Sequence, residues 1–275
     1  MAITTLAGVR AGMIQPIPIT KGSPGTPSAA CLSLWAMGGY PPAGSYNATL
    51  NGVALTGPVT GGIPFTNPVS GNTYIAGWRG RSRLNYYGGS WWICDRLWHN
   101  GGYTITSTSA QNSTTPAWPA RDANGSTNGE GVFLAVEVSA ATGAGTPTIT
   151  ISYTNSAGTA GRSATNIQAT ITTSSTASTY LIGLQAGDLG VRSVQSLTLS
   201  ATWTSGTINL VAYRPIFPFT LNAGANAPSG QTVMEDALTS GFPRVFDSSV
   251  LYYMNVEHSS FVGMAPIGVL RLTQG

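Results

Sequence analysis

The chain has 275 residues, enough for one large domain or two ordinary ones whose core needs no metal ion or disulfide framework. Only 8% of its residues are charged, whereas soluble domains carry about a quarter, so the surface must consist largely of neutral polar side chains. A net charge of +3 excludes the electrostatic footprint of a general nucleic-acid-binding protein.

Residues 1–30 are rich in proline and glycine, which block helix formation and remove backbone donors, so they predict an extended N-terminal arm. Ile14, Ile17 and Ile19 are apolar side chains that such an arm would bury when it binds a partner. The segment lacks the pattern of a secretory signal, and no stretch of the sequence is long and apolar enough for a membrane helix. We therefore expect a soluble protein made in a cytoplasm, with no membrane partner.

Residues 31–128 form an aromatic- and glycine-rich β region. Within it, residues 47–57 alternate in polarity around Asn51-Gly52, a dipeptide that favours a β-hairpin. Cys31 and Cys94 stand alone without a metal-binding or disulfide-rich pattern, so we expect reduced, buried thiols, although one disulfide between them is possible in principle.

Residues 129–216 carry the clearest strand pattern and predict a β-sandwich core. Leu197, Leu199, Ala201 and Trp203 alternate with polar residues, as in a strand with one buried face. Six β-rich segments, separated by turn residues, are typical of a sandwich or jelly roll: 131–140, 146–157, 165–175, 178–185, 194–203 and 206–214. The fold class we expect is all-β, a sandwich-like or jelly-roll-like body with the arm and at most one short helix.

Residues 217–275 predict a C-terminal β segment that packs on the body and contains the short helix. Thr232 and Glu235 have the spacing of a capping box ahead of Ala237 and Leu238, and Gly241 would end the helix. Two apolar runs, 250–258 and 261–272, predict closing strands.

The densest cluster of arginine and aromatic residues lies in residues 79–103. Arg79, Arg81 and Arg83 recur at the period of a strand, so they would project from one face. Such residues can hold single-stranded nucleic acid, but they are also enriched at protein interfaces, and the low net charge favours the latter. The candidate interface residues here are Arg79, Arg81, Arg83, Tyr86, Tyr87, Trp91 and Trp92.

Two clusters could hold a metal ion, and in both we favour a structural interpretation. Cys94, Asp95 and His99 have a spacing that is weak evidence for a metal site. Asp95 and Arg96 precede Trp98, and a structural ion pair beneath a tryptophan explains the pattern better. The second cluster is a loop that resembles, but departs from, a calcium-binding loop, and we interpret it as a turn stabilised by its own side chains: Asp122, Asn124, Ser126, Asn128 and Glu130. We expect no metal and no cofactor.

Catalytic candidates are scarce, since the chain has two histidines and nine carboxylates. No motif of a hydrolase, metalloprotease or nucleotide-binding loop is present in the sequence. We interpret Glu130 as a loop residue and Glu137 as an outward-facing strand residue, and we expect a protein that is not an enzyme.

Four strings, CDRLWHNGGYTITSTSAQ, PAWPARDANGSTNGEGV, ATGAGTPTITISYTNSAGTAGR and LGVRSVQSLTLSATWTSGTINLVAYR, resemble a family of virion structural proteins of tailed bacteriophages. The resemblance covers about residues 92–215, with a weaker echo in 236–244. It implies a capsid-decorating or cementing protein, located in the virion and made in the cytoplasm of a bacterial host. Its partners would be the major capsid protein or other virion proteins, and copies of the chain would form a homo-oligomer.

Three other roles remain open at this stage. The resemblance also fits a tail, collar or fibre-base component. A carbohydrate-binding receptor module would use Trp91, Trp92 and Tyr103 as an exposed stacking platform. A glycan-degrading enzyme would need two carboxylates in an open cleft, and the sequence offers no obvious pair.

Overall fold

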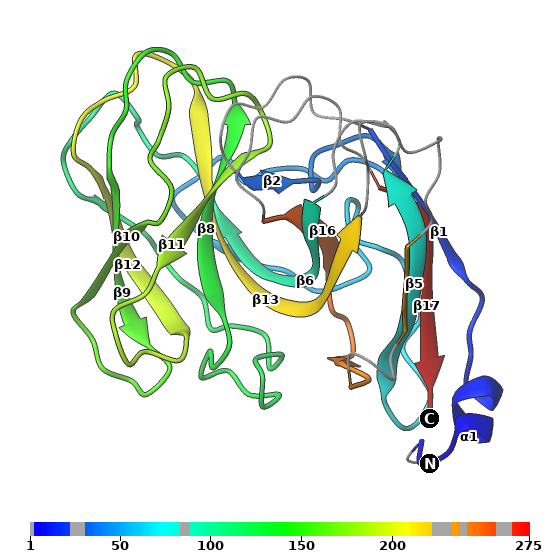
Figure 1. The fold of residues 1–275 in the computed structure, drawn as a ribbon. Coiled ribbons are helices and arrows are strands. Elements are labelled where there is room, and N and C mark those ends of the chain that lie inside the picture. The colour runs from blue at the N-terminus through cyan, green and yellow to red at the C-terminus, as the bar shows by residue number, and fades with distance from the viewer. Residues whose placement is uncertain (1–2, 23–30, 83–88, 222–232, 237–240, 257–265) are drawn as a thin grey trace.

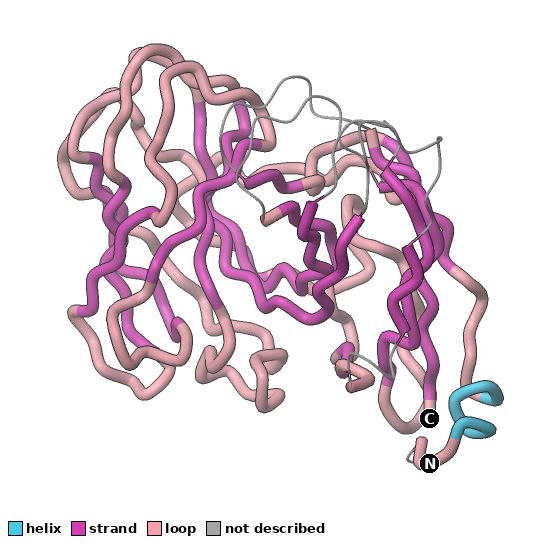
Figure 2. The backbone as a smooth tube through the Cα atoms, in the orientation of Figure 1, coloured by secondary structure: helices cyan, strands magenta, loops and turns pink. Residues whose placement is uncertain are grey.

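A computed structural model describes residues 3–22, 31–82, 89–221, 233–236, 241–256 and 266–275. The described chain is nearly all β, with one short helix, α1 (Leu6–Ala11), near the N-terminus (Figures 1 and 2). The all-β, sandwich-like fold expected from the sequence is confirmed. None of the helical turns in the described part has the length or apolar character needed to cross a membrane.

The strands form two antiparallel sheets. The smaller sheet has the order β14 (Val233–Asp236), β5 (Thr73–Ser82), β17 (Pro266–Gln274), β1 (Ile17–Lys21) and β3 (Gly39–Tyr40), and β15 (Arg244–Val245) also pairs with β5. The larger sheet has the order β2 (Cys31–Ser33), β16 (Leu251–Asn255), β6 (Gly89–Asn100), β13 (Thr207–Leu221), β8 (Phe133–Ala140), β11 (Ser178–Gly183), β10 (Arg162–Asn166), β9 (Ile149–Asn155), β12 (Val191–Leu199) and β7 (Gln111–Asn112), and β4 (Val53–Ala54) pairs with β6.

Six strands of the larger sheet close into a ring. β2 pairs with β16 on one side and with β11 on the other, so the series β2, β16, β6, β13, β8 and β11 returns to its start. The far end of β11 leaves the ring and pairs with β10, which begins the flanking sheet of β10, β9 and β12. A closed ring has no free strand edges, so the centre of the molecule is a small β-barrel between two sheets (Figure 1).

Three hydrophobic clusters hold the fold together: one between the barrel and the flanking sheet, one between the barrel and the smaller sheet, and one inside the barrel. Leu134, Val136 and Val138 of β8 pack outward against the flanking sheet of β9, β10 and β12. Ile93 of β6 and its neighbours pack against the smaller sheet. Because side chains alternate along a strand, the remaining face of the ring strands points to the barrel interior, where Cys94 lies in the third cluster.

Five of the six strand segments expected in residues 129–216 correspond to strands. Leu197 and Leu199 lie on the buried face of β12, as expected, although the strand ends at Leu199. The expectation for residues 165–175 was wrong, because the strand there is β10, which ends at Asn166. Asn166 instead turns the chain, donating from its amide to the carbonyl of Gln168.

The N-terminal segment is part of the body, which corrects the expectation of a free extended arm. Ile17 and Ile19 of β1 lie in the cluster beneath the smaller sheet, and β1 pairs with β17 and β3. Lys21 is also buried, and its ammonium group donates to the carbonyls of Met37 and Pro42. Burial lowers the pKa of Lys21 to about 8. Ile14 is half-buried against the same cluster.

Two local predictions were wrong because tertiary contacts override local signals. Residues 233–236 form β14, which pairs with β5, so the expected helix does not form there; Thr232, Ala237 and Leu238 lie outside the described residues. Asn51-Gly52 does not close a hairpin, since β4 pairs with β6. Gly52 is required for a different reason: a Cβ atom there would lie 2.0 Å from Nε1 of Trp98.

Replacing Ile19 by alanine should destabilise the whole protein. Ile19 is fully buried, so the change removes apolar contacts and leaves a cavity, at a cost of about 2–5 kcal/mol in the free energy of unfolding. Thr20→Ala, on the exposed side of the same strand, is the matched control and should cost less than about 0.5 kcal/mol. Denaturant unfolding measures both, and equal stability of Ile19→Ala and wild type would show that β1 does not belong to the folded body.

Candidate interaction surface

The outward face of the smaller sheet carries two arginines that the sequence singled out. Along β5, Trp78 and Gly80 are buried, whereas Arg79 and Arg81 are exposed. The alternation expected for these two arginines is therefore confirmed. Arg83, Tyr86 and Tyr87 lie outside the described residues.

Neighbouring strands extend this face with apolar and aromatic groups. Val269 of β17 lies opposite Arg79, and Ile267 lies opposite Arg81; both are half-buried. Arg271 follows on the same side of β17 and is exposed, between the buried Leu270 and Leu272. We call this surface the outer face; it consists of Pro18, Thr20, Tyr40, Arg79, Arg81, Ile267, Val269 and Arg271.

The three arginines of the outer face have no carboxylate partner in the described part of the chain. The ion pairs found there join Arg96 to Glu137, Arg121 to Asp95 and Arg162 to Asp188. Asp236 of β14 is also exposed, beside Gly77 of β5, so the outer face sets three arginines against one described carboxylate, with apolar side chains between the charges.

A groove of about 370 Å³ lies beside helix α1 at the other end of β5. Tyr74 contributes to it from the outward side of the strand, because its neighbours Thr73 and Ile75 are both buried. The groove is mostly apolar, and its remaining large side chains are Ile3, Leu6, Val9 and Phe242. A bulge between Ile75 and Gly77 offsets the alternation along β5, so Tyr74 and Arg79 point to the same side of the strand and the groove continues the outer face.

The other charged residues of the cluster 79–103 are structural. Asp95 accepts hydrogen bonds from Arg121 at 2.9 Å, from the Ser249 hydroxyl at 2.7 Å and from the Val250 amide at 2.8 Å. Arg121 also donates to the carbonyl of Leu55. Asp95 thereby holds two loops against β6 and has no oxygen facing a cleft.

Arg96, the next residue, points to the opposite side of β6, into the barrel. Its Nη1 lies 2.8 Å from Oε1 of Glu137 on β8, and both side chains are fully buried. The Arg96 guanidinium lies over the Trp35 ring, 4.6 Å from its centroid. Asp95 and Arg96 are both in structural ion pairs, but with Arg121 and Glu137, and the ring over Arg96 is that of Trp35. The outward-facing position expected for Glu137 was wrong. Glu137 is the counter-charge that allows Arg96 to be buried.

His99 lies beside this pair, and its Nδ1 is 3.4 Å from Nη2 of Arg96. Burial first, and the positive charge of Arg96 second, lower the pKa of His99 to about 3. His99 is therefore neutral at physiological pH and serves the packing of the barrel.

The loop around Asp122 is stabilised by its own hydrogen bonds, as expected. The buried Asp122 carboxylate accepts from the backbone amides of Asn124, Ser126, Gly129 and Glu130, and from the Ser126 hydroxyl. These donors lower the pKa of Asp122 against the effect of burial. Protein donors thus surround both carboxylate oxygens.

The tryptophans do not form the sugar-binding platform considered from the sequence. Trp91 is fully buried between the barrel and the smaller sheet, and Tyr103 is buried in the cluster beside the flanking sheet. Trp92 is half-buried and packs in the barrel interior. The three rings lie in three different clusters, so that platform is ruled out. Cys31 and Cys94 are free buried thiols, as expected.

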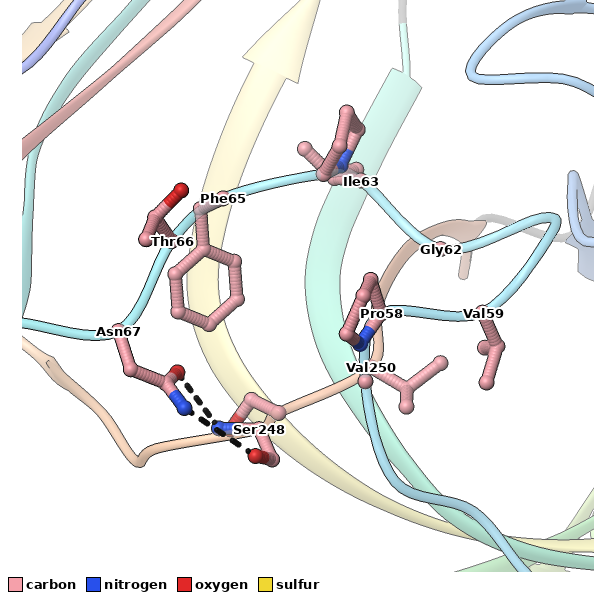
Figure 3. A pocket seen from close by; sticks show the side chains of 12 residues that line it. Pro58, Val59, Gly62, Ile63, Phe65, Thr66, Asn67, Ser248 and Val250 are labelled. Atoms are coloured by element: carbon pink, nitrogen blue, oxygen red, sulfur yellow. Dashed lines mark hydrogen bonds between the residues drawn. The ribbon is translucent and has the colours of Figure 1, made fainter.

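A second groove, of about 300 Å³, lies between residues 57–67 and the turn at 248–250 (Figure 3). Asn67 closes one end: its amide donates to the Ser248 hydroxyl, and its carbonyl oxygen accepts from the Ser248 backbone amide. Pro58, Val59 and Phe65 supply apolar walls. None of the residues that line this groove is ionisable, so it offers no acid or base.

No family model matches the chain, and neither a curated protein nor a solved structure matches it.

Protonation of His99 should make stability depend on pH. Its pKa is about 3 in the folded chain and about 6.5 when unfolded, so between these values the unfolded chain binds more protons. The stabilisation is complete above pH 6.5 and is lost as the pH falls towards 3, with a slope of up to about 1.4 kcal/mol per pH unit.

Urea unfolding between pH 7 and pH 4.5 measures this slope. His99→Gln should show a clearly shallower dependence than wild type over the same range. Identical slopes in the two proteins would mean that His99 is not held neutral in the barrel.

Proposed function

We propose that this chain is a non-enzymatic structural protein of a tailed-bacteriophage virion, which decorates or cements the capsid through protein contacts. The resemblance of residues 92–215 to virion structural proteins supports this role. A surface with few charges and a body with three packed clusters also suit a protein that neighbours contact on several sides.

The observation that carries the proposal is the outer face. Arginine and tyrosine are enriched where proteins bind one another, and here Arg79, Arg81 and Arg271 lie exposed with Tyr40 beside apolar side chains. The half-buried Ile267 and Val269 between the charges would give such a contact an apolar part. We therefore take the outer face as the contact with another virion protein.

The charged residues inside the body support a non-enzymatic role. Asp95, Asp122 and Glu137 are buried, and each is engaged by protein donors that hold loops or strands together. His99 is held neutral beside Arg96. These groups serve the fold rather than proton transfer.

A particle carries many copies of a decorating protein, arranged as a homo-oligomer or lattice. Each contact can then be weak, because simultaneous engagement of many copies stabilises the shell. A tail, collar or fibre-base component is the second candidate, since the same resemblance supports it. The two differ in copy number.

Quantitative mass spectrometry of purified, salt-washed particles tests the proposal. A decorating protein should be present in a fixed ratio to the major capsid protein, whereas a tail or collar component should be present in only a few copies. Particles assembled without this chain should release their DNA at a lower temperature, and adding the purified chain should restore the release temperature. Absence of the chain from washed particles would contradict a virion role.

A further inference from the structure

We propose that the outer face binds an acidic surface of a different virion protein, and that the groove beside α1 receives an apolar side chain of the same partner. This inference rests on the proposed function and specifies the chemistry of the partner. The site is defined by Arg79, Arg81 and Arg271, together with Tyr74 and Leu6 in the groove.

Charge determines the kind of partner. The three guanidinium groups are exposed and pair with no described carboxylate, so they are available to carboxylates of another chain. Arg79 and Arg81 project from one face of β5, and Arg271 projects from the adjacent strand. A partner with several Asp or Glu side chains would match this spacing, and its association would be accelerated by the opposite charges.

A second copy of this chain does not match the outer face. A symmetric contact would place arginines against arginines. Of the described carboxylates, Asp95, Asp122 and Glu137 are buried, Asp188 is paired with Arg162, and Glu130 accepts from the Asn124 side-chain amide, whereas Asp236 and Asp247 are exposed. Asp236 lies beside the outer face itself, so an acidic surface on another protein matches the three arginines better than a second copy does.

The apolar part of the surface favours protein over nucleic acid. Ile267 and Val269 separate the charges, and a phosphate backbone offers no apolar partner for them. Leu6 is 67% exposed at the groove, so its apolar side chain is available to a partner there. An acidic protein surface with an apolar anchor satisfies both features.

The test compares two charge reversals on exposed strand arginines. Arg79→Glu lies on the outer face, and Arg192→Glu lies on β12 of the flanking sheet, so both change the net charge equally. The probe is the particle assembled without this chain, and cosedimentation gives the apparent affinity. Arg79→Glu should weaken binding by about tenfold or more, and Arg192→Glu should stay within about twofold of wild type.

Two further measurements separate the apolar contribution of the groove from the contribution of the arginine charges. Leu6→Ser should weaken binding by about threefold or more without changing the melting temperature, because Leu6 is exposed in the free chain. Binding of wild type should weaken as salt is raised, and that dependence should be smaller for Arg79→Glu.

Equal binding by Arg79→Glu and wild type, with both folded as judged by circular dichroism, would overturn the inference. So would equal loss in Arg192→Glu, or competition by a single-stranded oligothymidylate, which would indicate nucleic acid as the partner. Failure of the wild-type chain itself to bind the particles would instead refute the proposed function, and this inference with it.

Discussion

The buried ion pair between Arg96 and Glu137 is the interaction on which the rest of the structure depends. It crosses the interior of a closed ring of six strands and joins β6 to β8, which are not neighbours in the ring. Removing one partner of such a pair leaves an uncompensated charge and costs about 3–5 kcal/mol. Its neighbour Asp95 points to the other side of β6 and holds the loops that carry Arg121 and Val250. Two adjacent residues thus fix both the inside and the outside of the barrel.

A rigid ring explains how a chain with so few charges presents a defined contact surface. The ring has no free edges, and its two outer sides pack against the flanking sheet and the smaller sheet. The smaller sheet has one face on the core, and Arg79, Arg81 and Arg271 project from its other face, part of which α1 covers near Thr273. Most of the buried charged residues form ion pairs or hydrogen bonds that hold strands and loops together. The exposed arginines are what remains for binding.

Local patterns predicted the fold class and the arginine positions, because alternation along a strand depends on neighbouring residues only. Alternation correctly placed two residues on a buried face, Leu197 and Leu199, and two on an exposed face, Arg79 and Arg81. The ring closure, the fate of the N-terminal segment and the burial of Glu137 were not predictable in this way. Each depends on which strands pair across long distances in the sequence, and local polarity patterns do not specify that pairing. The proline-rich start of the chain has the composition of a free arm, yet β1 pairs with β17 from the opposite end of the sequence.

Cryo-electron microscopy of the intact particle tests the central claim most directly, namely that the outer face of the smaller sheet is the contact with an acidic neighbour. The account predicts that the surface around Arg79 and Arg271 is covered by another protein, with Asp or Glu side chains within ion-pair distance and an apolar side chain beside Leu6. A particle in which this surface faces solvent, while the flanking sheet of β9, β10 and β12 makes the contact, would contradict it.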